Sequence, residues 1–212
     1  MSDQKRCPRA ATAPACPKKA QPRRRTAIHE AGHALASWWH GQPIYSVTAS
    51  RASIGESAIG PVDGHVHARR FLADSEQVSA MDNTTLRELV GRDLISYLAG
   101  PLAEARHCRC SLDEILQRSG AGDEQAAFDL LGFLETDQTD EWLAPMAEAI
   151  ERARRLLRRY WPAIVALADQ LQAHGHLDGA NVSALFCRLT GESPELRSNA
   201  LHTLDAGGAR HE

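Results

Sequence analysis

Residues 29–33 read His-Glu-Ala-Gly-His, and this H-E-x-x-H pentad constrains the fold most because its chemistry requires a helix. On a helix, His29 and His33 are four positions apart and lie one above the other on the same face. Both imidazoles can then reach one metal ion at the usual Zn–N distance of roughly 2.0–2.1 Å. Glu30 follows about 100° round the helix, so its carboxylate is placed to take a proton from a metal-bound water rather than to act as a ligand. The pentad therefore predicts the metal site of a zinc hydrolase.

The flanks of the pentad also have a helical pattern. A helix is predicted over residues 26–40, with Thr26 as its N-cap and Gly41 at its end. Gly32, between the two histidines, costs the helix about 1 kcal/mol relative to Ala. We therefore expect Gly32 to permit a close backbone approach, either by a neighbouring helix or by a substrate strand.

The length and composition allow one sizeable core, because the 212 residues are 43% hydrophobic. No apolar run approaches the ~18–20 residues that cross a bilayer. The basic N-terminus lacks the apolar stretch of a secretory signal. We expect a soluble, cytoplasmic protein.

The charge is distributed unevenly along the chain. Residues 1–25 contain eight Lys or Arg against one Asp, a net charge of +7; since the whole chain carries −3, the remainder carries −10. Rich in Pro and cations, this segment is predicted to be a disordered basic tail. Two interpretations stay open: a leader with no specific partner, which we favour, or an arm that docks on nucleic acid or an acidic partner.

Five cysteines are present, an odd number: Cys7, Cys16, Cys108, Cys110 and Cys187. Cys108 and Cys110 are too close for an ordinary disulfide or a C-x-x-C metal site, and no matching second pair exists. We expect reduced, structurally incidental thiols, with a second zinc knuckle as the alternative.

Two short strands are predicted after the first helix. Residues 43–50 and 62–71 have strand patterns, separated by a Gly- and Ser-rich loop over residues 51–61. His65 and His67 would share one face of the second strand. Such a pair can bind metal, but on an exposed strand it is usually just solvated.

The rest of the chain has helical periodicity, and Gly100-Pro101 is expected to kink or divide the longest helix. Helices are predicted over residues 83–107, from the capping box that begins at Ser111, from Gly122 to Leu134, over residues 140–160, from Pro162, and after Asp178. Residues 191–212 are expected to be frayed. The fold class is therefore mainly α (α+β): a helical bundle over residues 26–190 with a small two- or three-stranded sheet next to the H-E-x-x-H helix.

A catalytic zinc normally has a third protein ligand. The extended H-E-x-x-H-x-x-G-x-x-H form is absent, and His40 falls one residue out of register. The leading candidates are Asp123, in the first turn of a predicted helix where the dipole favours a carboxylate, and Glu104. Glu104 could instead support a ligand from behind through a hydrogen bond.

Four blocks of the chain, in the same order, resemble the peptidase domain of the FtsH family, the membrane-anchored AAA ATPase zinc proteases. They are residues Thr26–Leu35, Leu98–Glu104, Ser119–Asp123 with Ala126 and Ala127, and Leu167–Leu171 with Leu177–Gly179. The first is close to the family's signature, the second to its GGR-A-E helix, the third to its T-G-A-x-x-D segment and the fourth to its closing helices. The resemblance extends over residues 25–190.

The resemblance implies a mainly α-helical fold, with zinc held by His29, His33 and Asp123. It implies that Glu30 is the general base and that Glu104 supports the site from behind. The chain departs from the family in lacking a G-x-x-x-x-G-K-[ST] phosphate loop and membrane helices, and residues 50–61 differ from the family's Pro-Arg-Gly pattern. We therefore expect a stand-alone relative that cleaves flexible or unfolded polypeptides without its own ATPase motor.

The expected reaction is zinc-assisted peptide hydrolysis, with the substrate extended along the strand near residues 62–70. One alternative is a non-catalytic zinc-containing binding or regulatory module that retains the protease fold. A second is a hydrolase of non-peptide amide bonds. Glu30 favours an enzyme, because a structural zinc has no need of a base.

Overall fold

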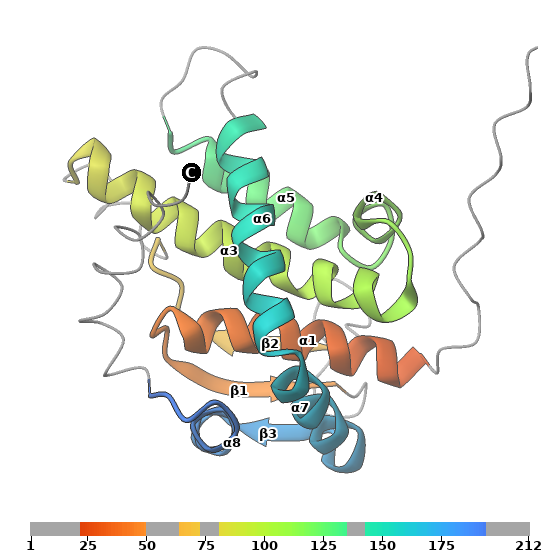
Figure 1. Ribbon diagram of the computed structural model, residues 1–212. Coiled ribbons are helices and arrows are strands. Elements are labelled where there is room, and N and C mark those ends of the chain that lie inside the picture. The colour runs from red at the N-terminus through yellow and green to blue at the C-terminus, as the bar shows by residue number, and fades with distance from the viewer. Residues whose placement is uncertain (1–21, 50–63, 73–80, 135–142, 194–212) are drawn as a thin grey trace, which may run out of the picture.

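The computed structural model describes residues 22–49, 64–72, 81–134 and 143–193 (Figure 1). Within these ranges, seven helices pack with a three-stranded sheet. The elements are α1 (Pro22–Trp39), β1 (Ile44–Thr48), β2 (His65–Ala68), α3 (Asn83–Cys108), α4 (Leu112–Leu116), α5 (Ala121–Leu131), α6 (Leu143–Arg159), α7 (Trp161–His174), β3 (His176–Asp178) and α8 (Gly179–Thr190). The predicted mainly α fold with a small sheet is confirmed.

The sheet is antiparallel, with the strand order β2-β1-β3. Val47 of β1 lies opposite Val66 of β2 and Leu177 of β3, so these three side chains share one face. Val47 and Val66 are buried on the face that α1 covers (Figure 1). The sequence pattern did not locate β3, because three residues are too few to show an alternation.

His65 and His67 lie on the other face of the sheet, where both are exposed. Their ring centroids are 6.3 Å apart, so the prediction that they share a face is confirmed. Neither belongs to the group of potential metal ligands found among the described residues.

α1 lies between the sheet and α3 (Figure 1) and is buried along most of its length. Gly32 faces α3: a Cβ at this position would lie 2.5 Å from the carbonyl oxygen of Ala99 and 2.8 Å from the Cβ of Ala103. The close approach expected at Gly32 is confirmed, and its partner is a neighbouring helix.

α3 is a single helix, although it contains Gly100 and Pro101 in its interior. Its N-cap Asp82 accepts hydrogen bonds from the backbone N–H groups of Thr84 and Thr85, both at 3.0 Å. A division of the helix at Gly100-Pro101, one of the two predicted outcomes, is therefore wrong, whereas a kink there stays a prediction. Residues 98–105 are all buried, and we attribute the continuity of the helix to this packing, which offsets the backbone hydrogen bond that Pro removes.

The shorter helices begin where their capping residues predict. Ser111 and Glu114 form the reciprocal capping box at the start of α4, Pro162 lies in the first turn of α7, and α8 follows Asp178. The boundaries differ from the predicted ones by a few residues. α5 ends at Leu131 rather than Leu134, for example.

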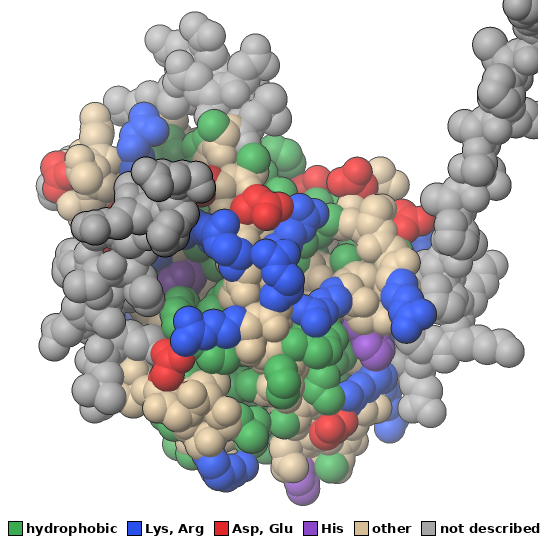
Figure 2. All heavy atoms as spheres, viewed as in Figure 1, with side chains coloured by type: hydrophobic (Ala, Val, Ile, Leu, Met, Phe, Trp, Pro, Cys, Tyr) green, Lys and Arg blue, Asp and Glu red, His purple; other side chains and the backbone are tan. Residues whose placement is uncertain are grey.

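α6 is strongly amphipathic. Ala149, Ala153 and Leu156 recur at helical spacing and are buried. The opposite face carries arginines, and Figure 2 shows basic side chains gathered over this helix. The exposed ones on α6 are Arg154, Arg155, Arg158 and Arg159. Residues 140–142, which the sequence assigned to this helix, lie outside the described ranges.

The N-terminal boundary of the folded part lies earlier than predicted. α1 begins at Pro22, so the expectation that Thr26 is the N-cap is wrong and the tail predicted over residues 1–25 is too long. Arg24 donates hydrogen bonds to Asp169 and Gln172 of α7, and Arg25 pairs with α3. These contacts with distant helices stabilise an extra turn of α1 that local capping rules do not reveal. Residues 1–21, with Cys7 and Cys16, lie outside the described ranges.

The C-terminal boundary also needs a correction. Glu192, assigned to the frayed end, accepts hydrogen bonds from Tyr160 and Arg159; residues 194–212 are outside the described part. Cys108 is buried, and Cys110 and Cys187 are partly buried. Within the described ranges, none of these three thiols forms a disulfide. None of the described helices is long and apolar enough to cross a membrane.

Candidate metal centre

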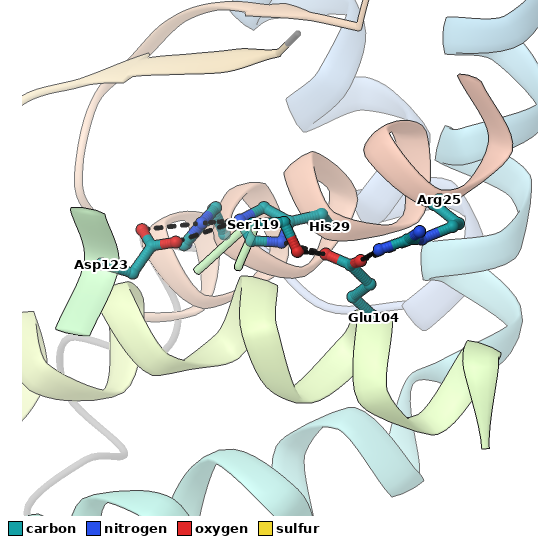
Figure 3. A network of polar contacts seen from close by, with 6 residues as sticks. Arg25, His29, Glu104, Ser119 and Asp123 are labelled. Carbon is teal, nitrogen blue, oxygen red and sulfur yellow. Dashed lines mark hydrogen bonds and ion pairs between the residues drawn. The ribbon is translucent and has the colours of Figure 1, made fainter. Parts of the chain in front are cut away.

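Three predicted ligands meet where α1, α3 and the start of α5 come together (Figure 3). The Nε2 atoms of His29 and His33 are 3.0 Å apart. The two carboxylate oxygens of Asp123 lie 3.1 Å from Nε2 of His29 and 3.2 Å from Nε2 of His33. Within the described ranges, these side chains form the group of three potential ligands able to hold a metal ion.

The spacing of these atoms suits a tetrahedral metal ion. Ligands about 2.0 Å from such an ion are separated from one another by roughly 3.3 Å. The separations of 3.0–3.2 Å are close to that value. The donor set, two imidazoles and one carboxylate, is also one that zinc binds.

The other nitrogen of each ring is held by an acceptor. Nδ1 of His29 lies 2.9 Å from Oε2 of Glu104, and Nδ1 of His33 lies 2.7 Å from the backbone oxygen of Ser96. A backbone carbonyl and an ionised carboxylate only accept, so each Nδ1 carries a proton. In the neutral rings, the Nε2 lone pairs therefore face each other and the Asp123 carboxylate. A cation among them would relieve the repulsion between these electron-rich atoms.

The electrostatics of the group favour a positive charge at its centre. Burial opposes a charge on His29, but hydrogen bonds with Asp123 and Glu104 raise its pKa to about 10. Burial also disfavours the ionised form of Glu104, yet the bonds from His29 and Arg25 lower its pKa to about 2. Burial likewise disfavours the ionised form of Asp123, but the neighbouring His33 and His29 lower the pKa of its carboxyl group well below the usual range. A proton or a metal ion can supply the required charge.

Glu30 lies on α1 next to His29 and is 7% exposed. Burial raises the pKa of its carboxyl group above the usual range, which makes its carboxylate a better proton acceptor near neutral pH. Gly64, just before β2, touches this side chain: a Cβ at residue 64 would lie 2.5 Å from Oε1 of Glu30. The outer strand β2 therefore begins beside Glu30.

Gly100 makes room for the ring of His33, whereas the sequence had suggested only that Gly100-Pro101 kinks or divides the helix. A Cβ at residue 100 would lie 2.2 Å from Nε2 of His33. The spacing of Ser96, Gly100 and Glu104 was an available signal, because residues four apart share a helix face. That face of α3 meets the face of α1 that carries His29 and His33.

Glu104 lies behind His29 and not among the converging atoms. Its carboxylate is 2% exposed and also accepts hydrogen bonds from Arg25 and Ser119 (Figure 3). Neither residue was predicted to contact Glu104, because Arg25 was assigned to the tail and Ser119 appeared only in a block that resembles the FtsH family.

A second set of polar contacts that was not predicted surrounds Asp93, which is fully buried. Its carboxylate accepts hydrogen bonds from the side chain of Gln42 and from the backbone N–H groups of Phe71 and Leu72 at 3.3 and 3.1 Å. Burial raises the pKa of Asp93. The group ties the segment after β2 to α3, one turn before the Ser96 carbonyl that holds His33.

Comparison of the chain with protein-family models and with curated proteins finds no match. The resemblance to the FtsH peptidase domain therefore stays a prediction from four sequence blocks.

Proposed function

We propose that this protein is a zinc-dependent endopeptidase that hydrolyses flexible or unfolded polypeptides without an ATPase motor of its own. One observation carries the proposal. Nε2 of His29, Nε2 of His33 and the Asp123 carboxylate converge to within 3.0–3.2 Å of one another, and Glu30 follows His29 on the same helix. Two imidazoles, one carboxylate and a separate glutamate are the parts of a catalytic zinc site.

His29, His33 and Asp123 would hold the ion. A zinc ion bound there would supply Lewis-acid chemistry, lowering the pKa of a water molecule and polarising the scissile carbonyl. Glu104 and the Ser96 carbonyl keep the two rings oriented through Nδ1, as the outer partners of ligating histidines commonly do.

In this proposal, Glu30 is the residue that transfers the proton. Its carboxylate accepts a proton from the attacking water and later donates that proton to the amine that leaves when the peptide bond breaks. The raised pKa of Glu30 suits both steps, because a group that binds its proton more tightly is the better base in the first step and still releases it to an amine.

The position of β2 at an edge of the sheet favours a polypeptide as the substrate. Among the described strands, β2 is one of the two outer strands of the sheet, and Gly64 brings its start against Oε1 of Glu30. An extended peptide that pairs with β2 would run towards Glu30, held by backbone hydrogen bonds that do not depend on its sequence. Such pairing requires an unfolded segment, which agrees with a preference for flexible chains.

The test is cleavage of an unfolded casein by the zinc-loaded protein. We expect fragments that disappear when a chelator removes the metal and reappear when zinc is restored, and no fragments from a Glu30→Gln protein purified in the same way. Zinc binding without cleavage of any unfolded polypeptide would contradict the proposal and favour a non-catalytic module.

A further inference from the structure

Glu104 receives hydrogen bonds from three side chains (Figure 3). Its Oε2 accepts from Nδ1 of His29 at 2.9 Å and from Oγ of Ser119 at 2.8 Å. Its Oε1 accepts from Arg25, whose Nε lies 3.0 Å away and whose Nη2 is a second donor. Because the carboxylate is almost fully buried, these partners replace the water that an ionised group needs.

Arg25 differs from the other two donors in its charge. Ser119 is neutral, and the His29 ring is neutral whenever its Nε2 binds a metal. The guanidinium stays protonated at any pH at which the protein is folded. It is therefore the side chain that balances the negative charge of Glu104 when a metal is bound.

The orientation of His29 depends on Glu104, and that of Glu104 depends on Arg25. The imidazole can turn about its side-chain bonds, and the bond from Nδ1 to Glu104 sets the direction in which Nε2 points. Glu104 has three side-chain torsions of its own. The contacts of Arg25 and Ser119 with its two oxygens determine them.

We propose that Arg25 is a positioning residue of the metal centre, which holds the Glu104 carboxylate in the orientation that fixes the His29 ring for metal binding. This inference rests on the proposed zinc site. Arg25 is not one of the potential metal ligands; its proposed effect passes through Glu104.

Ser119 extends the effect of Arg25 to the third ligand. It lies four residues before Asp123, in the connection between α4 and α5. The same oxygen of Glu104 bonds to both Ser119 and His29. A displaced Glu104 would therefore disturb the first histidine and the segment that carries the Asp123 carboxylate together.

Competition with a chelator for zinc measures the effect. We expect Arg25→Gln to lower the zinc affinity by roughly 10- to 100-fold, as losses of outer partners of metal ligands do. Arg25→Lys, which keeps the charge, should recover part of the loss. The matched control is Arg24→Gln: Arg24 is the neighbouring residue on α1 but bonds to Asp169 and Gln172 of α7, so this variant should keep the wild-type affinity.

The absorption spectrum of bound Co²⁺ separates positioning from a general loss of stability. Arg25→Gln should change the visible bands, because they report the arrangement of the ligands, whereas Arg24→Gln should leave them unchanged. A wild-type Co²⁺ spectrum in Arg25→Gln, or equal losses of zinc affinity in both variants, would overturn the inference.

A measurement without metal keeps this inference apart from the proposed function. In the metal-free protein, the Nδ1 proton of His29 should give an NMR signal protected from exchange with water, assigned by its absence in His29→Gln. We expect this signal to persist in Arg24→Gln and to be lost in Arg25→Gln. Its persistence in Arg25→Gln would refute the positioning role. A wild-type protein that binds no zinc would refute the proposed function, and the NMR result would still decide the role of Arg25.

Discussion

The backbone carbonyl oxygen of Ser96 accepts a hydrogen bond from Nδ1 of His33, and the two atoms are 2.7 Å apart. The other histidine instead uses a side chain, that of Glu104, at 2.9 Å. A mutation can therefore remove the partner of His29 directly. The partner of His33 can be displaced only by moving the backbone of α3 or by crowding the ring, so the roles of the two histidines can be tested separately.

Replacement of Glu30 by Gln tests the general base. The amide has nearly the same shape but cannot accept the proton, so turnover of unfolded casein should fall by about 10²- to 10⁴-fold. The zinc content should stay at the wild-type level, because the proposed ligands are untouched. Wild-type turnover in this variant would remove Glu30 from the mechanism.

Replacement of Asp123 by Ala tests the third ligand. Zinc affinity should drop by more than about 100-fold, since even outer partners of metal ligands are worth 10- to 100-fold. Asp129→Ala is the control, because Asp129 is an exposed carboxylate on the same helix that bonds to Gln125. Metal analysis after dialysis distinguishes them, and equal zinc content in the two variants would exclude Asp123 as a ligand.

Gly100→Ala tests the space that α3 leaves for His33. The added Cβ would lie 2.2 Å from Nε2, so the ring must move out of line with Nε2 of His29. We expect zinc affinity to fall by at least about tenfold, the lower range for disturbed outer contacts.

Gly91→Ala is the matched control for this effect. Residue 91 is also a glycine of α3, and a Cβ there meets nothing within 4 Å. The control should keep its zinc affinity and gain up to about 1 kcal/mol of stability from the higher helix propensity of Ala. Chelator competition and urea unfolding measure the two quantities. A Gly100→Ala protein with wild-type affinity would show that the His33 ring does not need this space.

Most relationships within one helix could be predicted from the sequence, whereas few contacts between helices could. His29 and His33 could be recognised as a pair because a separation of four residues places them on one helix face. A close neighbour of Gly32 could be predicted because a glycine destabilises the interior of a helix. The position of Asp123 in the first turn of a helix followed from local periodicity and from the family resemblance.

The supporting residues depend on tertiary contacts. Arg25 is 79 positions from Glu104, and no local pattern distinguishes it from the arginines beside it. A proline in the interior ordinarily breaks a helix. Pro101 is instead buried within the continuous helix α3, and no local sequence rule predicts the packing around it. The three residues of β3 pair with β1 across more than a hundred positions. In each case, the observed structure is stabilised by contact with a distant part of the chain, which sequence periodicity does not identify.

The metal-free protein should lose stability as the pH rises through neutral and alkaline values. The pKa of His29 is raised from 6.5 to about 10 in the folded state. Protonated His29 therefore stabilises the fold fully below pH ~6.5, and this contribution disappears as the pH approaches 10. At about 1.4 kcal/mol per pKa unit, the loss is at most about 5 kcal/mol. Urea unfolding in the presence of a chelator, at several pH values between 6 and 10, measures it.

Zinc should abolish most of this pH dependence. A bound ion would take the place of the proton between Nε2 of His29 and the Asp123 carboxylate, so the charge would be supplied at any pH in the range. The zinc affinity should accordingly rise with pH as the competing proton is released. Asp123→Ala, which removes one hydrogen-bond acceptor of His29, should flatten the curve of the metal-free protein. Parallel losses of stability with and without zinc would contradict the exchange of a proton for a metal ion at this centre.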